Sequence, residues 1–154
     1  MSQYLTLAEF RATTTMPWGD VDDLEVAAPG WIVNQVIVVS GMADARLRKR
    51  YAAPFVAPVP DIVRSWVARI VTLRAYLRRG VDARDAQFQV ILDDATRAEA
   101  EIKEAADSKD GLFELPIRQD LPTTGGIARG GPLGYSEASP YTWTTVQSDT
   151  AADE

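Results

Sequence analysis

Two residue types that carry much of enzyme chemistry are missing from this chain, which contains no cysteine and no histidine. Without cysteine, neither disulfides nor thiolate metal sites can form. Without histidine, the commonest general base and the commonest metal ligand are absent together. These absences exclude zinc chemistry and the Ser-His and Cys-His types of nucleophilic catalysis.

The chain also lacks a long apolar run, and Met1 is not followed by the basic and apolar pattern of a leader. The longest candidate run, 31–39, is interrupted by Asn34 and Gln35 and is shorter than the roughly 18 apolar residues of a membrane span. The 154 residues, 46% of them hydrophobic, suffice for one domain with a core. The composition therefore predicts a soluble, single-domain protein made inside the cell, with no membrane partner.

Charge is distributed unevenly along the chain, whose net charge is −6. Residues 41–84 hold ten Arg and Lys against three Asp and Glu, whereas 1–40 carry −4, 85–115 carry −6 and 116–154 carry −3. A basic middle between acidic flanks can bind a polyanion or pair with acidic surfaces of a neighbouring subunit. It can equally be neutralised by the acidic segment within each monomer. The sequence leaves all three interpretations open.

Hydrophobic spacing and capping signals predict an all-α core in residues 1–115, a small helical bundle of one short and three long helices. The pattern Thr6-Leu7-Ala8-Glu9 is a capping box, which places the short helix up to about Thr13. Residues 14–25 are predicted to form a loop, because they contain a proline, a glycine and a cluster of four acidic side chains, Asp20, Asp22, Asp23 and Glu25.

The first long helix is predicted to follow Pro29-Gly30 and to end near Tyr51. Apolar residues recur in it at helical spacing and should form one buried face, which comprises Ile32, Val36, Val39, Ala43 and Leu47. Trp31, Val38 and Met42 fall on another face. This helix is therefore predicted to be contacted from two sides.

Two further long helices carry apolar stripes of the same kind. One has Pro60 in its first turn and ends at Arg78-Arg79-Gly80. Its predicted core residues are Ile62, Trp66, Ile70, Leu73 and Leu77, widened by Val63, Val67 and Val71. The other begins with Asp82 as its N-cap and ends at Asp110-Gly111. Its predicted core residues are Phe88, Leu92, Ala95, Ala98 and Ile102.

A connector with three prolines, residues 54–60, joins the basic end of the first long helix to the next helix. Proline fixes φ and disfavours helix in the residue before it, so this segment is predicted to be stiff and extended. A hinge of this kind holds two helices at a set angle. That property suits a scaffold more than a catalyst.

The composition changes after Leu115, where glycine and proline interrupt a segment without apolar periodicity. Residues 116–154 are therefore predicted to form an extended arm with no core of its own. Tyr135, Tyr141 and Trp143 are large side chains in this polar segment. Free tails rarely need such anchors, so the arm is predicted to dock on a partner, with strand addition as one mode.

The acidic and glycine-rich segments match no catalytic or cofactor pattern. The cluster at 20–25 lacks the spacing of a calcium-binding loop, which favours a solvated acidic surface. Glycine pairs at 125–126 and 130–131 lack the strand, the helix and the GK[ST] sequence of a phosphate-binding loop. The sequence thus predicts no enzyme activity, no cofactor and no metal site.

The arginine and lysine residues raise the question of nucleic-acid binding. Arg46 and Arg50 share a predicted helix face, as do Arg74 and Arg78, and such rows can meet phosphates. No helix-turn-helix, RNA-recognition or zinc pattern accompanies them. The candidate residues for a subunit interface or a DNA channel are Arg46, Arg48, Lys49, Arg50, Arg74 and Arg78.

Four segments combine in a recognisable order: Tyr4-Leu5-Thr6, Leu47-x-x-Arg50-Tyr51-x-x-Pro54-Phe55, Pro58-Val59-Pro60 and Asp110-Gly111-x-x-x-Leu115-Pro116. In this order and spacing the chain resembles the head-tail adaptor proteins of tailed bacteriophages, also called head-completion or connector proteins, especially those of the Mu-like group. The resemblance covers about residues 4–117.

The resemblance implies an α-helical virion protein, made in the host cytoplasm, that forms a ring of adjacent subunits, usually twelve, beneath the portal protein in the neck. Such a ring extends the channel for packaged DNA and supports the next connector or stopper protein. It also implies that the C-terminal arm reaches a neighbouring protein, here through Tyr135, Tyr141 and Trp143. The alternative that the residues leave open is a small helical nucleic-acid-binding or regulatory protein with an Arg-rich surface.

Overall fold

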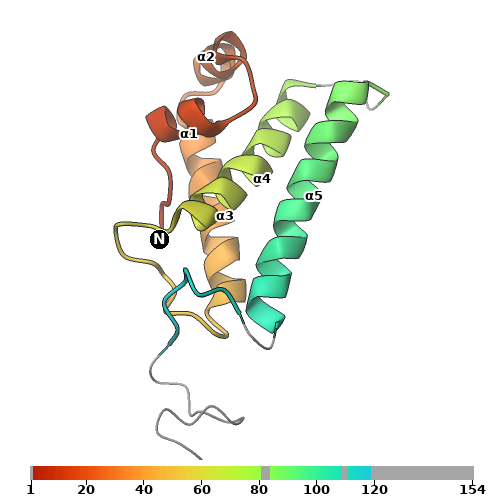
Figure 1. Cartoon of the computed structure of the whole chain (residues 1–154). Coiled ribbons are helices and arrows are strands. Elements are labelled where there is room, and N and C mark those ends of the chain that lie inside the picture. Colours follow the sequence, from red (N-terminus) through yellow and green to blue (C-terminus); the bar gives the residue numbers. More distant parts are fainter. Residues whose placement is uncertain (1, 81–83, 109–110, 119–154) are drawn as a thin grey trace, which may run out of the picture. The chain divides into compact units, whose positions relative to one another are not determined.

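The computed structural model describes residues 2–80, 84–108 and 111–118 (Figure 1). Five α-helices and no β-strand occur in these ranges, so the predicted helical fold is confirmed there. The helices are α1 (Leu7–Thr13), α2 (Trp18–Ala27), α3 (Trp31–Leu47), α4 (Asp61–Arg79) and α5 (Ala86–Asp107). The predicted arm anchors Tyr135, Tyr141 and Trp143 lie outside the described residues.

The predicted capping box starts α1 as expected. The Thr6 hydroxyl accepts a hydrogen bond from the Glu9 N–H at 3.2 Å, and the Glu9 carboxylate accepts one from the Thr6 N–H at 2.7 Å. These reciprocal bonds satisfy two N–H groups that a helix start leaves without intrahelical partners. Phe10 is the residue that α1 buries in the core.

The predicted loop at 14–25 is wrong, because most of it belongs to α2. Pro17 does not break this helix: it stands at the N-cap, where a missing N–H costs nothing, and its carbonyl accepts from the N–H groups of Asp20 and Val21. Val21 and Leu24 bury one side of the helix. The core is therefore covered by two short helices, where the sequence predicted one.

The buried face of α3 is the predicted one, since all five of its apolar residues are buried, together with Ser40 and Asp44. Gly30 precedes the helix with φ +74, a left-handed conformation that glycine adopts without strain. The Glu25 carboxylate of α2 accepts from the N–H groups of Gly30 and Ile32 at 3.0 and 3.3 Å. The helix ends at Leu47, earlier than the predicted Tyr51, and Arg50 therefore lies beyond it in a turn.

The core stripe of α4 is centred differently from the prediction. Trp66 and Ile70 are buried as expected, but Leu77 is 57% exposed, whereas the three flanking valines are fully buried. The reason is that α4 packs against both α3 and α5, so it buries two adjoining faces (Figure 1). Pro60 is the N-cap residue and not part of the first turn, and Gly80 ends the helix with φ +84.

The N-cap of α5 is Asp85 and not Asp82, which lies outside the described residues. The Asp85 carboxylate accepts from the Gln87 N–H at 3.0 Å, the bond that defines a cap. Four of the five predicted core residues are buried, and Ile91 takes the place of the half-buried Leu92.

Charge between α4 and α5 is neutralised within the chain. Arg69 on α4 lies 2.8 Å from the Asp94 carboxylate and 3.0 Å from the Glu101 carboxylate of α5. The Trp66 indole N–H donates to Glu101 at 2.7 Å. At these positions the basic middle of the chain is neutralised by its acidic flank within one monomer, which is one of the three interpretations that the sequence leaves open.

Candidate functional site

Residues from three of the four segments that carry the family resemblance lie in the same hydrophobic core. Tyr4, Tyr51, Phe55 and Leu115 each come from one of three of these segments, and all four are buried members of the same hydrophobic cluster. Pro60, from the remaining segment, is the last residue of the connector and the N-cap residue of α4. We call these four buried residues, together with Asp44, the connector junction.

Tyr4 and Asp44 form the polar centre of the connector junction. The Tyr4 hydroxyl donates to the Asp44 carboxylate and accepts from the Phe55 N–H at 2.9 Å, and the Ser2 hydroxyl also donates to Asp44. Burial, reinforced by the bond to Asp44, raises the pKa of Tyr4 well above its ordinary value. The phenol therefore stays protonated and serves as a fixed hydrogen-bond donor, which is a structural role.

Tyr51, which precedes the connector, is bonded to α5 and to the segment that follows α5. Its hydroxyl donates to the Ala105 carbonyl of α5 at 3.0 Å and accepts from the Leu112 N–H at 2.8 Å. An isolated antiparallel bridge pairs Tyr51 with Ile117, supported by a bond of 2.8 Å from the Ala52 N–H to the Pro116 carbonyl. Residues 116–118, predicted as the beginning of the arm, are thus held against residues 50–52, just before the connector.

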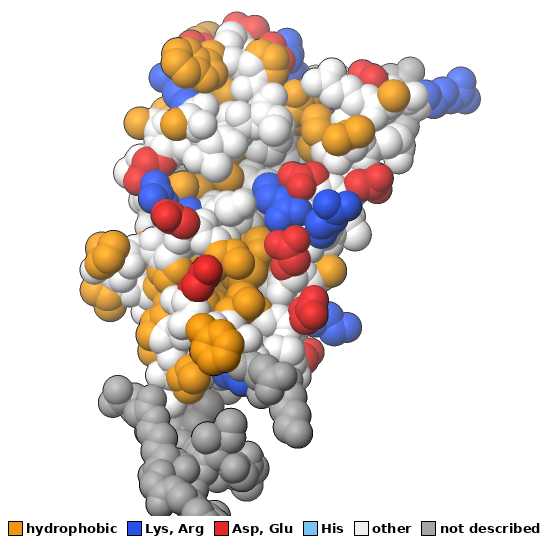
Figure 2. Space-filling view, viewed as in Figure 1, with side chains coloured by type: hydrophobic (Ala, Val, Ile, Leu, Met, Phe, Trp, Pro, Cys, Tyr) orange, Lys and Arg blue, Asp and Glu red, His pale blue; other side chains and the backbone are white. Residues whose placement is uncertain are grey.

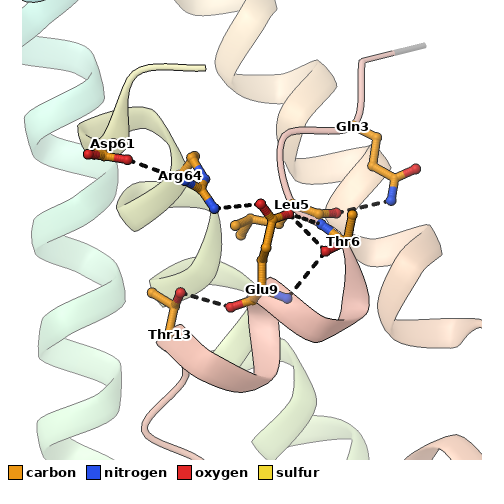
Figure 3. Close-up of polar contacts among 7 residues, drawn as sticks. All are labelled: Gln3, Leu5, Thr6, Glu9, Thr13, Asp61 and Arg64. Atoms are coloured by element: carbon orange, nitrogen blue, oxygen red, sulfur yellow. Dashed lines mark hydrogen bonds and ion pairs between the residues drawn. The ribbon is translucent and has the colours of Figure 1, made fainter. Parts of the chain in front are cut away.

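An open groove of about 1050 Å³ separates the N-terminal segment from the connector, with Leu5, Pro58 and Val59 among its lining residues. Its lining residues include Glu9, Asp61 and Arg64 of Figure 3, where Arg64 of α4 is paired with Glu9 of α1. The Arg64 guanidinium lies 2.6 Å from the Glu9 carboxylate and 3.3 Å from the Asp61 carboxylate. The Thr6 backbone and side chain, helped by Arg64, lower the pKa of Glu9.

The predicted cation candidates near the end of α3 divide into two pairs. Lys49 forms an ion pair of 2.6 Å with Asp107, and the Arg50 guanidinium donates to the Ser108 carbonyl. Arg46 and Arg48 are exposed, and no ion pair involves their side chains in the part of the chain that the structure describes. Only the latter pair therefore presents cations to a partner without first breaking an ion pair or a side-chain hydrogen bond.

The predicted candidates on α4 reach back across α3. The Arg74 guanidinium donates to the Gln35 side chain at 2.9 Å and lies 3.2 Å from the Met42 sulfur. The Arg78 guanidinium stands 5.9 Å from the centroid of the Trp31 ring, a cation–π distance. Arg78 and Arg74 thus lie along α3, from Trp31 near its beginning to Met42, which is one helical turn before Arg46.

Several large hydrophobic side chains are exposed although the core is filled. On α2, Trp18 is 72% and Val26 83% exposed, and Phe113 after α5 is 98% exposed. Figure 2 shows that hydrophobic side chains gather over the lower half of the visible face, with acidic side chains between them. Exposed tryptophan and phenylalanine at such positions are typical of contact surfaces, since aromatic residues dominate binding energy at interfaces.

A second opening lies along the solvent-facing side of α3. It is a groove of about 510 Å³, lined by Ser2, Ile37, Val38, Gly41, Asp44, Ala45, Arg48 and Pro54. The predicted second face of α3 contributes Val38 to this groove, next to the exposed Met42. Val38 is 48% exposed, and Met42 is contacted by Arg74 of α4 but is still 38% exposed.

The described residues contain no group of three or more acidic side chains placed to hold a metal ion. In the same residues, no single helix has both the length and the apolar composition to cross a membrane, and α2 and α3 would pass together only as a pair bent by 100°.

Comparisons of the chain with protein-family models, with curated proteins and with solved structures give no match.

Sequence reasoning missed the surface of α2, because the region was interpreted as a loop. The signal was present in the spacing of Trp18, Asp22 and Val26, which recur every four residues and share one face of a helix. The groove on α3 could be inferred only in part. Trp31, Val38 and Met42 were placed on a second face, but Gly41 and Ala45, whose small side chains hollow that face, were not singled out.

Proposed function

We propose that this protein is a structural head-tail adaptor of a tailed bacteriophage, located at the neck of the virion. In this proposal adjacent copies form a ring below the portal protein, extend the DNA channel and support the next connector or stopper protein. The observation that carries the proposal is the connector junction, because segments from three separate parts of the sequence that make up the resemblance converge on one buried cluster. Residues whose spacing reflects a shared fold are expected to converge in this way.

The exposed surfaces of the described residues support a role in assembly. Trp18 and Val26 form one apolar surface, and the α3 groove forms a second one with a different shape and charge. A ring needs two different surfaces on each copy, because its subunits contact one another head to tail. The polar groups of the connector junction satisfy one another, which suits a structural role.

The C-terminal arm is proposed to dock on the portal or on a ring neighbour through Tyr135, Tyr141 and Trp143. The test is to complete DNA-filled heads that lack the chain, with the full chain or with a chain ending at Arg118. We expect both chains to show the same helical circular dichroism, and only the full chain to attach to heads. Attachment of the shortened chain at the full level would contradict the docking arm.

A gel shift with duplex DNA at low and moderate salt tests the alternative, a nucleic-acid-binding protein. The adaptor proposal predicts little affinity of the free chain for DNA, because most of the predicted cation candidates already contact groups in their own chain. Tight binding that falls steeply with salt would favour the alternative.

A further inference from the structure

The exposed side of α2 has the composition of a docking element. Trp18, Asp22, Asp23 and Val26 lie on the side opposite the buried Val21 and Leu24, and we call these four residues the α2 outer face. Asp22 is paired with Arg11, whereas Asp23 is exposed and makes no ion pair within the described residues. The α2 outer face thus presents two large apolar side chains around an acidic centre.

The groove along α3 has the complementary composition. Ile37, Val38, Gly41 and Ala45 give it apolar walls and a floor of small residues, and Arg48 stands at its end; we call these five residues the α3 outer face. An added Cβ on Gly41 would meet no atom within 4 Å, so the space above this residue is open. The opening therefore suits a large apolar side chain from outside, flanked by an anion.

The two outer faces cannot meet within one copy. The inner side of α2 is packed on its own chain, and Glu25 fixes this helix at the N-terminal end of α3 through Gly30 and Ile32. Arg48 follows the other end of α3, which is about 25 Å away for a helix of 17 residues at 1.5 Å per residue. Acidic and basic surfaces at opposite ends of one helix are complementary between copies and not within one.

We propose that the α2 outer face of one copy docks in the groove of the α3 outer face of the next copy. Trp18 and Val26 enter the apolar part of the groove, and Asp23 lies near Arg48 of the neighbour. This inference rests on the proposed ring and names its subunit contact. Because the two surfaces differ, the contact is head to tail, and repeating it with a closing rotation generates a ring.

A symmetric contact between two α3 outer faces is the competing arrangement. It would leave Trp18 and Val26 exposed and Asp23 without a cationic partner, and it would bring together two surfaces that each carry Arg48. Like charges across an interface oppose association, so the charges favour the head-to-tail arrangement.

Two variants of the full chain test the contact, one on each surface. Gly41→Leu fills the groove, and it should leave the fold intact because Leu is a better helix former than Gly and the space is open. Trp18→Ala removes the anchor from the α2 outer face, where its side chain is mostly exposed. Val90→Ala, at an exposed position on α5, is the matched control.

The readout is sedimentation velocity at increasing protein concentration. We expect the unchanged chain and Val90→Ala to form oligomers larger than dimers, and each surface variant to associate at least about 30-fold more weakly, as for loss of an interfacial tryptophan anchor. An equal mixture of the two variants should form one-to-one dimers and nothing larger. In that mixture the intact α2 outer face of Gly41→Leu can dock only in the intact groove of Trp18→Ala.

Charge exchange tests the orientation of the contact. Asp23→Arg and Arg48→Asp should each weaken association by about fivefold or less, as expected for an exposed ion pair, and the chain that carries both changes should recover. Asp23→Arg changes the net charge from −6 to −4 and Arg48→Asp changes it to −8, so a general effect of net charge would act in opposite directions in the two single variants. Weaker association in both single variants, with recovery in the double variant, is therefore specific to a contact between these two positions.

Three results would overturn the contact: an unchanged chain that stays monomeric at its highest soluble concentration, surface variants that associate as the unchanged chain does, or a mixture without dimers. The adaptor proposal fails separately, if the unchanged chain does not attach to DNA-filled heads. Heads completed normally by Gly41→Leu and Trp18→Ala would refute the contact and leave the adaptor function standing.

Discussion

Tyr4 joins three parts of the molecule through a single hydroxyl. It links the N-terminal segment to Asp44 of α3 and to the Phe55 N–H of the connector. Because both Tyr4 and Asp44 are buried, water cannot easily replace either bond. The position of the connector therefore depends on one polar atom as well as on apolar packing.

We predict that Tyr4→Phe destabilises the fold by about 1–3 kcal/mol, because the buried Phe55 N–H loses its acceptor and Asp44 loses a donor. The measurement is the free energy of unfolding in urea. Tyr76→Phe is the matched control, since the structure gives the Tyr76 hydroxyl no hydrogen bond among the described residues, and it should cost much less. Equal losses in the two variants would show that the Tyr4 hydrogen bonds contribute nothing.

At the scale of single elements, α1 makes a pH-dependent contribution through its capping box. Hydrogen bonds from Thr6, helped by Arg64, lower the pKa of Glu9 in the folded state. A lowered pKa means that the folded state favours the ionised carboxylate. The stabilisation is fully present above the unfolded pKa of about 4.3 and is lost as the pH falls through the lower, folded pKa.

We therefore predict that Glu9→Gln reduces stability at neutral pH and that this difference shrinks on acidification below about pH 4. Thermal unfolding of both proteins, measured from pH 7 downwards, gives the difference directly. Gln keeps the capping geometry but carries no charge, so it isolates the charged part of the interaction. A difference that stays constant with pH would contradict a role for the Glu9 charge.

Among the helices, the beginning of α1 and the end of α4 were predictable from the sequence, whereas α2 was not. The beginning of α1 and the end of α4 at Gly80 depend on neighbouring residues, and local signals predicted both. At the beginning of α2, Pro17 and Gly19 are residues typical of loops. The helix is stabilised by burial of Val21 and Leu24, which the local sequence does not indicate. Tertiary packing overrides weak local propensity in this way.

At the scale of the whole molecule, the candidate site depends on contacts between distant parts of the chain. The order of the resemblance segments was visible in the sequence, but the bond from Tyr4 to Asp44 and the bond from Leu112 to Tyr51 join residues 40 and 61 positions apart. Spacing cannot reveal such partners. The same limit applies to the cations, since the pairing of Lys49 with Asp107 follows only once α3 and α5 lie side by side.

After α5 the chain folds back, and residues 116–118 bond to residues 50–52, just before the connector. These contacts are expected to stabilise the whole fold. We expect a chain ending at Arg118 to unfold at the same urea concentration as the full chain, and a chain ending at Ser108 to lose about 2–4 kcal/mol. The shorter chain lacks Leu115, which is only 2% exposed, and it leaves the Ala52 N–H without its acceptor. Unfolding is followed by circular dichroism of the helices.

Leu115→Ala in the full chain separates the two causes of that loss. If burial of Leu115 dominates, this variant alone should reproduce most of the destabilisation, because removing a buried leucine side chain costs about 2–5 kcal/mol. If the backbone bonds to residues 50–52 dominate, the variant should stay close to the full chain. Equal stability of the chains ending at Ser108 and Arg118 would mean that residues 111–118 rest on the connector without stabilising it, and the connector would then have to be held by Tyr4 and Phe55 alone.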